Sequence, residues 1–147
     1  RVGDLAKNTA KRVIAIESNF ASQRLVAGVE HIAELSLAQL KNVLDAYAAR
    51  DLAAARIVWE RDDEIDAMYT SLFRELLTYM MEDPRNITFC THLLFCAKNL
   101  ERIGDHATNI AETVHYLVTG SPLVEERPKK DMSSSTAVAY TGAVTGD

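Results

Sequence analysis

Four acidic residues stand at positions of this sequence where apolar side chains are expected. Asp62 and Asp66 are four residues apart in a segment typical of a helix, and Glu101 and Asp105 repeat this spacing further along the chain. Residues four apart are neighbours on one helix face, where like charges cost roughly 0.2–0.5 kcal/mol. Such carboxylates need compensation by a proton, by Arg or Lys, or by a bound cation.

The two aspartates interrupt two apolar stripes of seven-residue spacing, which are Ala55, Asp62, Tyr69, Leu76 and Trp59, Asp66, Phe73, Met80. Folding the chain back at Pro84 brings both acid pairs to nearly one height, because each pair lies at almost the same distance in sequence from this proline. Oxygen ligands suit Mg²⁺, Ca²⁺, Mn²⁺ or an iron or zinc cluster. The four acids are therefore a candidate metal site. The alternative is that they are solvated surface charges, with Arg61 and Arg102 close enough in sequence to pair with some of them.

Other residues with chemical potential form weaker patterns. Glu112 and His115 have the Glu-x-x-His spacing of di-iron bundles, but such sites need this motif twice. His92 and Cys96 have the spacing of a soft-metal pair, yet Cys96 falls in an apolar seam, and both cysteines, Cys90 included, are interpreted as core residues. The sequence contains no nucleophile–base pair and no Gly-rich phosphate loop, so it assigns no reaction class and predicts a protein that is not an enzyme.

Four amphipathic helices must position these residues. Apolar or small side chains recur at helical spacing over residues 1 to about 20, 25–50, 52–82 and 86–118. In the first helix they are Val2, Ala6, Thr9, Val13, Ile16 and Phe20. Asp51 is a predicted N-cap, and Pro84 and Gly120 are predicted stops. The most regular seam is that of the last helix, which predicts near-antiparallel packing in an all-α bundle.

The motif around Asp105 occurs twice. Residues 1–13 and 102–114 are identical at seven of thirteen positions, including Arg-x-Gly-Asp at the start of each copy. The helices that precede the second copy have no counterpart before the first. We therefore expect the last helix of a truncated first unit over 1–21, one complete unit over 22–122, and a flexible tail over 123–147.

Composition limits the classes of function. Hydrophobic residues make up 48% of the 147 residues and charged residues 25%, which is typical of a soluble helical protein. The net charge of −5 argues against nucleic acid as the principal ligand, because phosphate contacts need clustered Lys and Arg. No apolar run reaches the ~18 residues of a membrane span, and no signal peptide is visible, so the expected location is the cytoplasm.

The string from Asn99 to Glu112, together with Asp62-Asp-Glu-Ile-Asp66, resembles the signature of PhoU proteins, which regulate bacterial phosphate uptake. The resemblance covers residues 1 to about 122 and implies two tandem three-helix bundles. Of these the chain would hold the last helix of the first and an antiparallel three-helix bundle that forms the complete second.

The resemblance also implies a site and partners. Some members of the family bind iron or zinc clusters through an acid-x-x-x-Asp motif, which would make Asp62, Asp66, Glu101 and Asp105 ligands and Asp4 the remnant of a first site. The implied role is an adaptor that restrains a PhoR-type histidine kinase and the PstB-type ATPase of the phosphate transporter when phosphate is plentiful.

Two further readings of the sequence remain open: a metal-dependent or metal-storage bundle, and a purely structural bundle. Because the first helix carries an apolar seam without the helices that would cover it, we also expect a homodimer or higher oligomer.

Overall fold

The computed structural model describes residues 1–16 and 23–125, and over these residues the protein is helical without a strand. The helices are α1 (Val2–Ala15), α2 (Gln23–Ala49), α3 (Leu52–Glu60), α4 (Asp62–Glu82) and α5 (Ile87–Thr119). The short 3₁₀ helix η2 (Pro84–Asn86) joins α4 to α5. The predicted all-α class is confirmed. The proposed tail lies outside the described residues from residue 126 onward, and so does Phe20.

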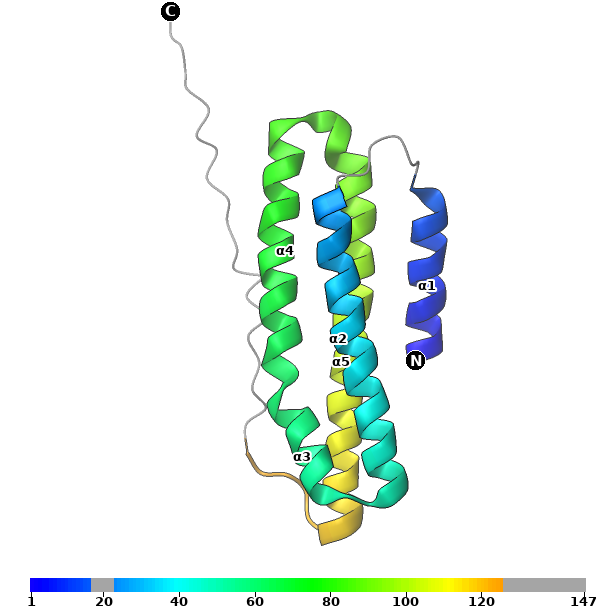
Figure 1. Cartoon of the computed structure of the whole chain (residues 1–147), viewed down its shortest axis with the longest axis vertical. Helices are drawn as coiled ribbons and strands as arrows, with labels where there is room; N and C mark the ends of the chain where they lie inside the picture. Colours follow the sequence, from blue (N-terminus) through cyan, green and yellow to red (C-terminus); the bar gives the residue numbers. More distant parts are fainter. Residues whose placement is uncertain (17–22, 126–147) are drawn as a thin grey trace, which may run out of the picture.

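The helices form a three-helix bundle with one additional helix at its side (Figure 1). α2 and α5 run in the same direction, and α3 and α4 together return antiparallel to both. α1 packs along α5 and runs opposite to it. α5 is therefore the central helix, because every other α-helix packs against it.

Several helix ends follow the sequence signals. The side chain of Asp51 accepts a hydrogen bond from the backbone N–H of Ala54 at 3.0 Å, which confirms it as the N-cap of α3. Gly120 ends α5 in the left-handed conformation at φ 73°, which glycine adopts without steric cost. Pro84 is the first residue of η2, which follows the end of α4. The Asp83 carboxylate caps this short helix by accepting a hydrogen bond from the backbone N–H of Arg85.

The prediction of one continuous helix over residues 52–82 is wrong, because the helix is broken at Arg61. Arg61 leaves the helical region with φ −92° and ψ 8°, so it ends α3 and precedes α4. Asp62, Asp63 and Glu64 then occupy the first turn of α4, where the helix dipole favours negative charge. The Gln39 side chain of α2 donates a hydrogen bond to the Arg61 carbonyl at 2.9 Å and so satisfies a backbone group at the break.

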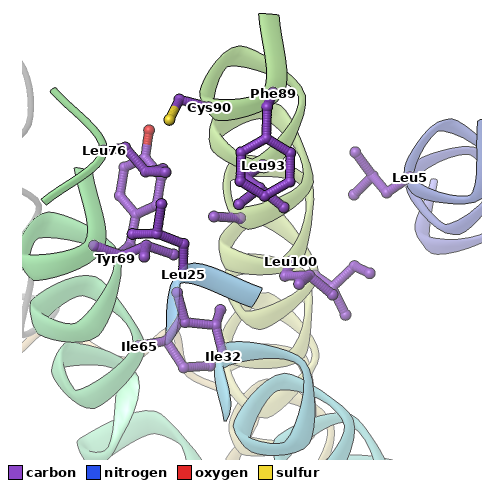
Figure 2. Packing of buried hydrophobic residues seen from close by; sticks show 13 residues of the cluster. Leu5, Leu25, Ile32, Ile65, Tyr69, Leu76, Phe89, Cys90, Leu93 and Leu100 are labelled. Atoms are coloured by element: carbon purple, nitrogen blue, oxygen red, sulfur yellow. The ribbon is translucent and has the colours of Figure 1, made fainter. Parts of the chain in front are cut away.

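The core consists of two apolar clusters along the bundle. The first fills the space between α2, α4 and α5 with residues such as Ile32, Tyr69 and Leu93, and Leu5 reaches it from α1 (Figure 2). The second lies between α2, α3 and α5 around Trp59. The cysteines Cys90 and Cys96 are free and buried, which confirms them as core residues, and burial raises the pKa of both thiols.

The predicted seam of the first helix is only partly correct. Leu5 is its buried residue, although it is not in the predicted seam, whereas Ala6 is exposed and Val13 is 58% exposed. Val2 and Ile16 of the seam are half-buried and pack against the first core cluster, and Val13 lines an open apolar pocket between α1, α2 and α5. Ala6, Ala10 and Ile14 form an exposed flank of α1.

Candidate functional site

The acidic residues singled out by the sequence lie at the interface of α4 and α5, with one exception. Asp62, Asp66 and Glu101 are buried, with exposures of 3%, 3% and 4%, and Asp105 is half-buried beside them. Asp4 is exposed on α1. Three of these carboxylates are therefore not the solvated surface charges that the sequence left open as an alternative.

Asp62 is stabilised by two features of the fold. Its carboxylate accepts a hydrogen bond of 2.7 Å from the hydroxyl of Thr108 on α5, and this hydroxyl also donates to the Gly104 carbonyl. Asp62 is also the first residue of α4, so its charge lies at the favourable end of the helix dipole. The break at Arg61 thus turns a mid-helix aspartate into an N-terminal one.

The hydrogen bond between Asp62 and Thr108 joins the first turn of α4 to the second half of α5. The sequence placed Asp62 near the height of Asp105, three residues before Thr108 on α5, by folding the chain at Pro84. The chain does reverse at this point, through η2.

Glu101 is the buried carboxylate with the least complete set of partners. Lys98 donates to its Oε1 at 3.0 Å, and the Lys98 ammonium lies 4.8 Å from the centre of the Tyr69 ring. The Oε2 atom is buried and has no hydrogen-bond partner among the described residues. Burial raises the pKa of Glu101, Lys98 opposes this shift, and the nearby charges of Asp105 and Asp66 reinforce it.

These side chains do not fit a preformed metal centre. In residues 1–16 and 23–125, no group of three or more His, Cys, Asp or Glu side chains lies close enough together to hold a metal ion. The reason is visible in the contacts: Asp62 is hydrogen-bonded to a hydroxyl, and Glu101 is paired with an ammonium group. Metal binding by Asp62, Asp66, Glu101 and Asp105 therefore stays a prediction that requires rearrangement.

The weaker candidates serve other contacts. The Glu112 carboxylate accepts a hydrogen bond of 3.2 Å from the indole N–H of Trp59. The Nδ1 atom of His115 lies 3.0 Å from the Ser121 carbonyl oxygen. The Cys96 thiol points to the Thr9 carbonyl at 3.9 Å. Each contact links two segments of the chain and involves no second metal ligand.

Sequence reasoning missed the groups that compensate the acids. It proposed Arg61 and Arg102, but the Arg61 guanidinium pairs with the exposed Glu64 instead. The pairing of Lys98 with Glu101 could have been predicted from the sequence, because a lysine three residues before a glutamate lies on the same helix face. Thr108 carried no such signal, since it donates to an acid on another helix.

The fold and its site define an all-helical bundle protein in which buried polar groups connect the helices. None of the helices in the described part of the chain is both long enough and apolar enough to cross a membrane. Residues 29–114 match the family model described as PhoU domain. The chain therefore belongs to the PhoU family, as its resemblance in sequence indicated.

Relatives and solved structures agree with this family. The chain is 68% identical over 135 residues to a protein of Rhizobium meliloti named phosphate-specific transport system accessory protein PhoU homolog, a match that covers 92% of the chain and 57% of that protein. It is 54% identical over 134 residues to the Caulobacter vibrioides protein (strain NA1000 / CB15N) of the same name, covering 91% and 58%.

Two crystal structures share the fold. PhoU from Pseudomonas aeruginosa matches with a TM-score of 0.77 and 42% identity, over 81% of this chain and 57% of that one. The phosphate transport system regulatory protein PhoU from Streptococcus pneumoniae matches with a TM-score of 0.75 and 29% identity, over 84% and 57%. The chain thus spans somewhat more than half the length of these proteins.

Proposed function

We propose that the protein is an accessory regulator of phosphate uptake that acts by protein contact and not by catalysis. The observation that carries this proposal is the 68% identity to a protein named for the phosphate-specific transport system. At this identity the bundle and its surface are shared closely enough for a common role to be the simplest explanation.

The proposed partners are a sensor histidine kinase of the PhoR type and the PstB-type ATPase of the phosphate transporter. Both would be restrained in the cytoplasm when phosphate is plentiful. The polar contacts within the bundle support an adaptor role, because Asp62, Gln39 and Glu112 are each used to join one helix to another. Such contacts hold a rigid helical surface for a partner to recognise.

Arg61 and Arg102 are the surface positions that we assign to this recognition. Each is exposed and adjacent in sequence to a buried acid, Asp62 or Glu101, so the bundle core fixes the backbone from which each arginine extends. Arginine on a rigid surface gives charge complementarity, which sets association rate and specificity.

Deletion and complementation test the proposal. Deleting the gene should leave the phosphate-starvation response switched on in phosphate-rich medium. A copy with Arg61→Glu and Arg102→Glu should fail to restore repression while its circular dichroism remains that of a folded helical protein. Arg74→Glu is the matched control, because Arg74 is equally exposed on α4 but lies away from the acid motif; it should restore repression.

Two outcomes would contradict the proposal. If the deletion strain represses the response normally, the regulatory role is wrong. If the double reversal restores repression as well as Arg74→Glu does, the assigned surface is wrong and partner binding must use another face.

A further inference from the structure

α1 is a basic helix in an acidic protein. It carries Lys7, Lys11 and Arg12 against the single acid Asp4, whereas the whole chain has a net charge of −5. Leu5 anchors α1 in the core, and the helix packs along α5 in the opposite direction. This packing places the basic end of α1 beside the first half of α5.

A pocket of about 310 Å³ lies at this contact. Asn8, Lys11 and Arg12 line it from α1, and His92, Phe95 and Asn99 line it from α5. The lining thus contains two permanent cations, two amides and an imidazole, and no carboxylate. A metal cation would be repelled by this set, whereas an anion would be attracted.

The two cations are available for a ligand. Neither Lys11 nor Arg12 forms an ion pair with an acid anywhere in the described ranges, unlike Lys98, which is paired with Glu101. Arg12 is held in place by an aromatic ring, since its guanidinium carbon lies 4.0 Å from the centre of the Phe95 ring. A stacked guanidinium is fixed in position while its N–H groups at the edge remain able to donate.

His92 adds a group that the packing of the bundle leaves unused. Its Nδ1 atom is shielded from solvent and has no hydrogen-bond partner within the part of the chain that the structure describes. A buried polar atom without a hydrogen-bond partner is uncommon in a folded protein, which marks His92 as a candidate ligand-binding group in the pocket that it lines. The thiol of Cys96 points to Thr9, so His92 is not part of a soft-metal pair.

We propose that this pocket between α1 and α5 binds a phosphate group, either as the free ion or as a phosphate monoester. Guanidinium, ammonium and amide groups all donate hydrogen bonds, and a tetrahedral oxyanion accepts them on every side. The pocket is larger than a bare oxyanion requires, so a small ester group fits beside it. The inference concerns a different surface from the acid motif and does not depend on the proposed regulatory role.

Calorimetric titration of the 147-residue chain tests the proposal with two probes, inorganic phosphate and glycerol phosphate, at constant ionic strength. Saturable binding should appear with at least one probe, and the tighter of the two identifies the free ion or the ester as the ligand form. Arg12→Gln and Lys11→Gln should each weaken binding roughly tenfold or more, because each removes a charge-assisted hydrogen bond.

Lys7→Gln is the matched control. It removes the same charge from the same helix but lies outside the pocket, so binding should change less than about twofold. Lys11 is exposed, so Lys11→Gln keeps the test valid even if Arg12→Gln disturbs α1. Absence of saturable binding by both probes would overturn the proposal, as would equal losses in Lys7→Gln and Lys11→Gln.

Discussion

Two of the buried carboxylates at the α4–α5 interface, Asp62 and Glu101, are compensated by different physical means. Asp62 combines a hydroxyl donor with the N-terminal end of a helix, whereas Glu101 relies on one half-exposed lysine. Removing either donor leaves desolvated charge without its partner, which costs more than the contact itself contributes. The residues around these acids are therefore where single substitutions should reveal the energetics of the site.

Thr108→Val should destabilise the protein by about 1–3 kcal/mol, because it removes the hydroxyl that donates to the buried Asp62 carboxylate. Thr113→Val on the same helix is the control. Its hydroxyl is exposed and donates to the Asn109 carbonyl on the same helix, so the change should be within about 0.5 kcal/mol. Urea unfolding followed by circular dichroism measures both, and equal effects would show that the Thr108–Asp62 bond contributes nothing specific.

The raised pKa of Glu101 predicts a dependence of stability on pH. The unfolded residue loses its proton at its ordinary pKa, whereas the folded one keeps the proton to higher pH. Between these two values the folded state binds more protons, so this residue's contribution to stability falls as pH rises through the window. Glu101→Gln should remove this component, seen as a flatter stability profile above pH 4.5 in urea titrations, while the exposed control Glu82→Gln should not.

Metal binding at Asp62, Asp66, Glu101 and Asp105 stays a prediction, and Lys98 makes it testable. A cation at these carboxylates has to displace the Lys98 ammonium from Glu101, so Lys98→Gln should strengthen binding. When the free cation concentration is a hundred times its Kd, cation binding should stabilise the folded protein by about 2.7 kcal/mol, which is measured as a higher melting temperature. Glu101→Gln should lose most of this gain. Melting temperatures of wild type and Lys98→Gln that do not respond to iron, zinc, manganese or magnesium would remove the metal hypothesis.

At the scale of the helices, the break at Arg61 and the close contact of α4 with α5 determine where the acids lie. Gly104 permits this contact, because a Cβ atom there would lie 2.8 Å from the Cδ1 atom of Ile65. Its equivalent in the first copy of the repeat is Gly3, which has nothing within 4 Å. The same motif thus meets a packed helix in one copy and open space in the other.

Gly104→Ala should destabilise the bundle by roughly 1 kcal/mol, since overpacking costs about 1–3 kcal/mol and the gain in helix propensity is at most ~1 kcal/mol. Adding Ile65→Val should recover part of this loss by removing the clashing methyl group. Gly3→Ala should instead stabilise α1 by about 0.5–1 kcal/mol. Thermal or urea unfolding of these three variants and of Ile65→Val alone checks these signs, and additive effects of Gly104→Ala and Ile65→Val would exclude the proposed clash.

For the molecule as a whole, the uncovered flank of α1 is the main departure from a closed bundle. Val13 and Ile14 are 58% and 84% exposed, and Ala6 and Ala10 are exposed on the same helix. An apolar flank of this kind is typical of an interaction surface. We infer that it associates with a second copy of the chain.

The protein should therefore be a dimer or higher oligomer by light scattering at tens of micromolar. A double change, Val13→Asp with Ile14→Asp, should shift the equilibrium toward monomer, because burying two carboxylates at an apolar interface is unfavourable. Lys7→Asp, which adds a carboxylate outside this apolar pair, should leave the oligomer intact. A wild-type monomer under these conditions would contradict the prediction.

Much of the architecture was readable from the sequence, because it depends on local chemistry. Helical periodicity predicted an all-α bundle, Asp51 and Gly120 marked helix ends, and the two interrupted stripes singled out the aspartates that are buried. These features follow from residues within a few turns of one another, where side-chain spacing and backbone preference decide the outcome.

The tertiary structure alone decided which groups meet. The hydrogen bonds that Thr108 donates to Asp62 and Gln39 donates to the Arg61 carbonyl join residues 46 and 22 apart in sequence. Their partners depend on how α2, α4 and α5 pack against one another, which no local pattern in the sequence encodes. Burial and pairing of charges depend on such long-range contacts, so the sequence singled out the acids by their place in apolar stripes, and the packing determined that three of them are buried and what they bind.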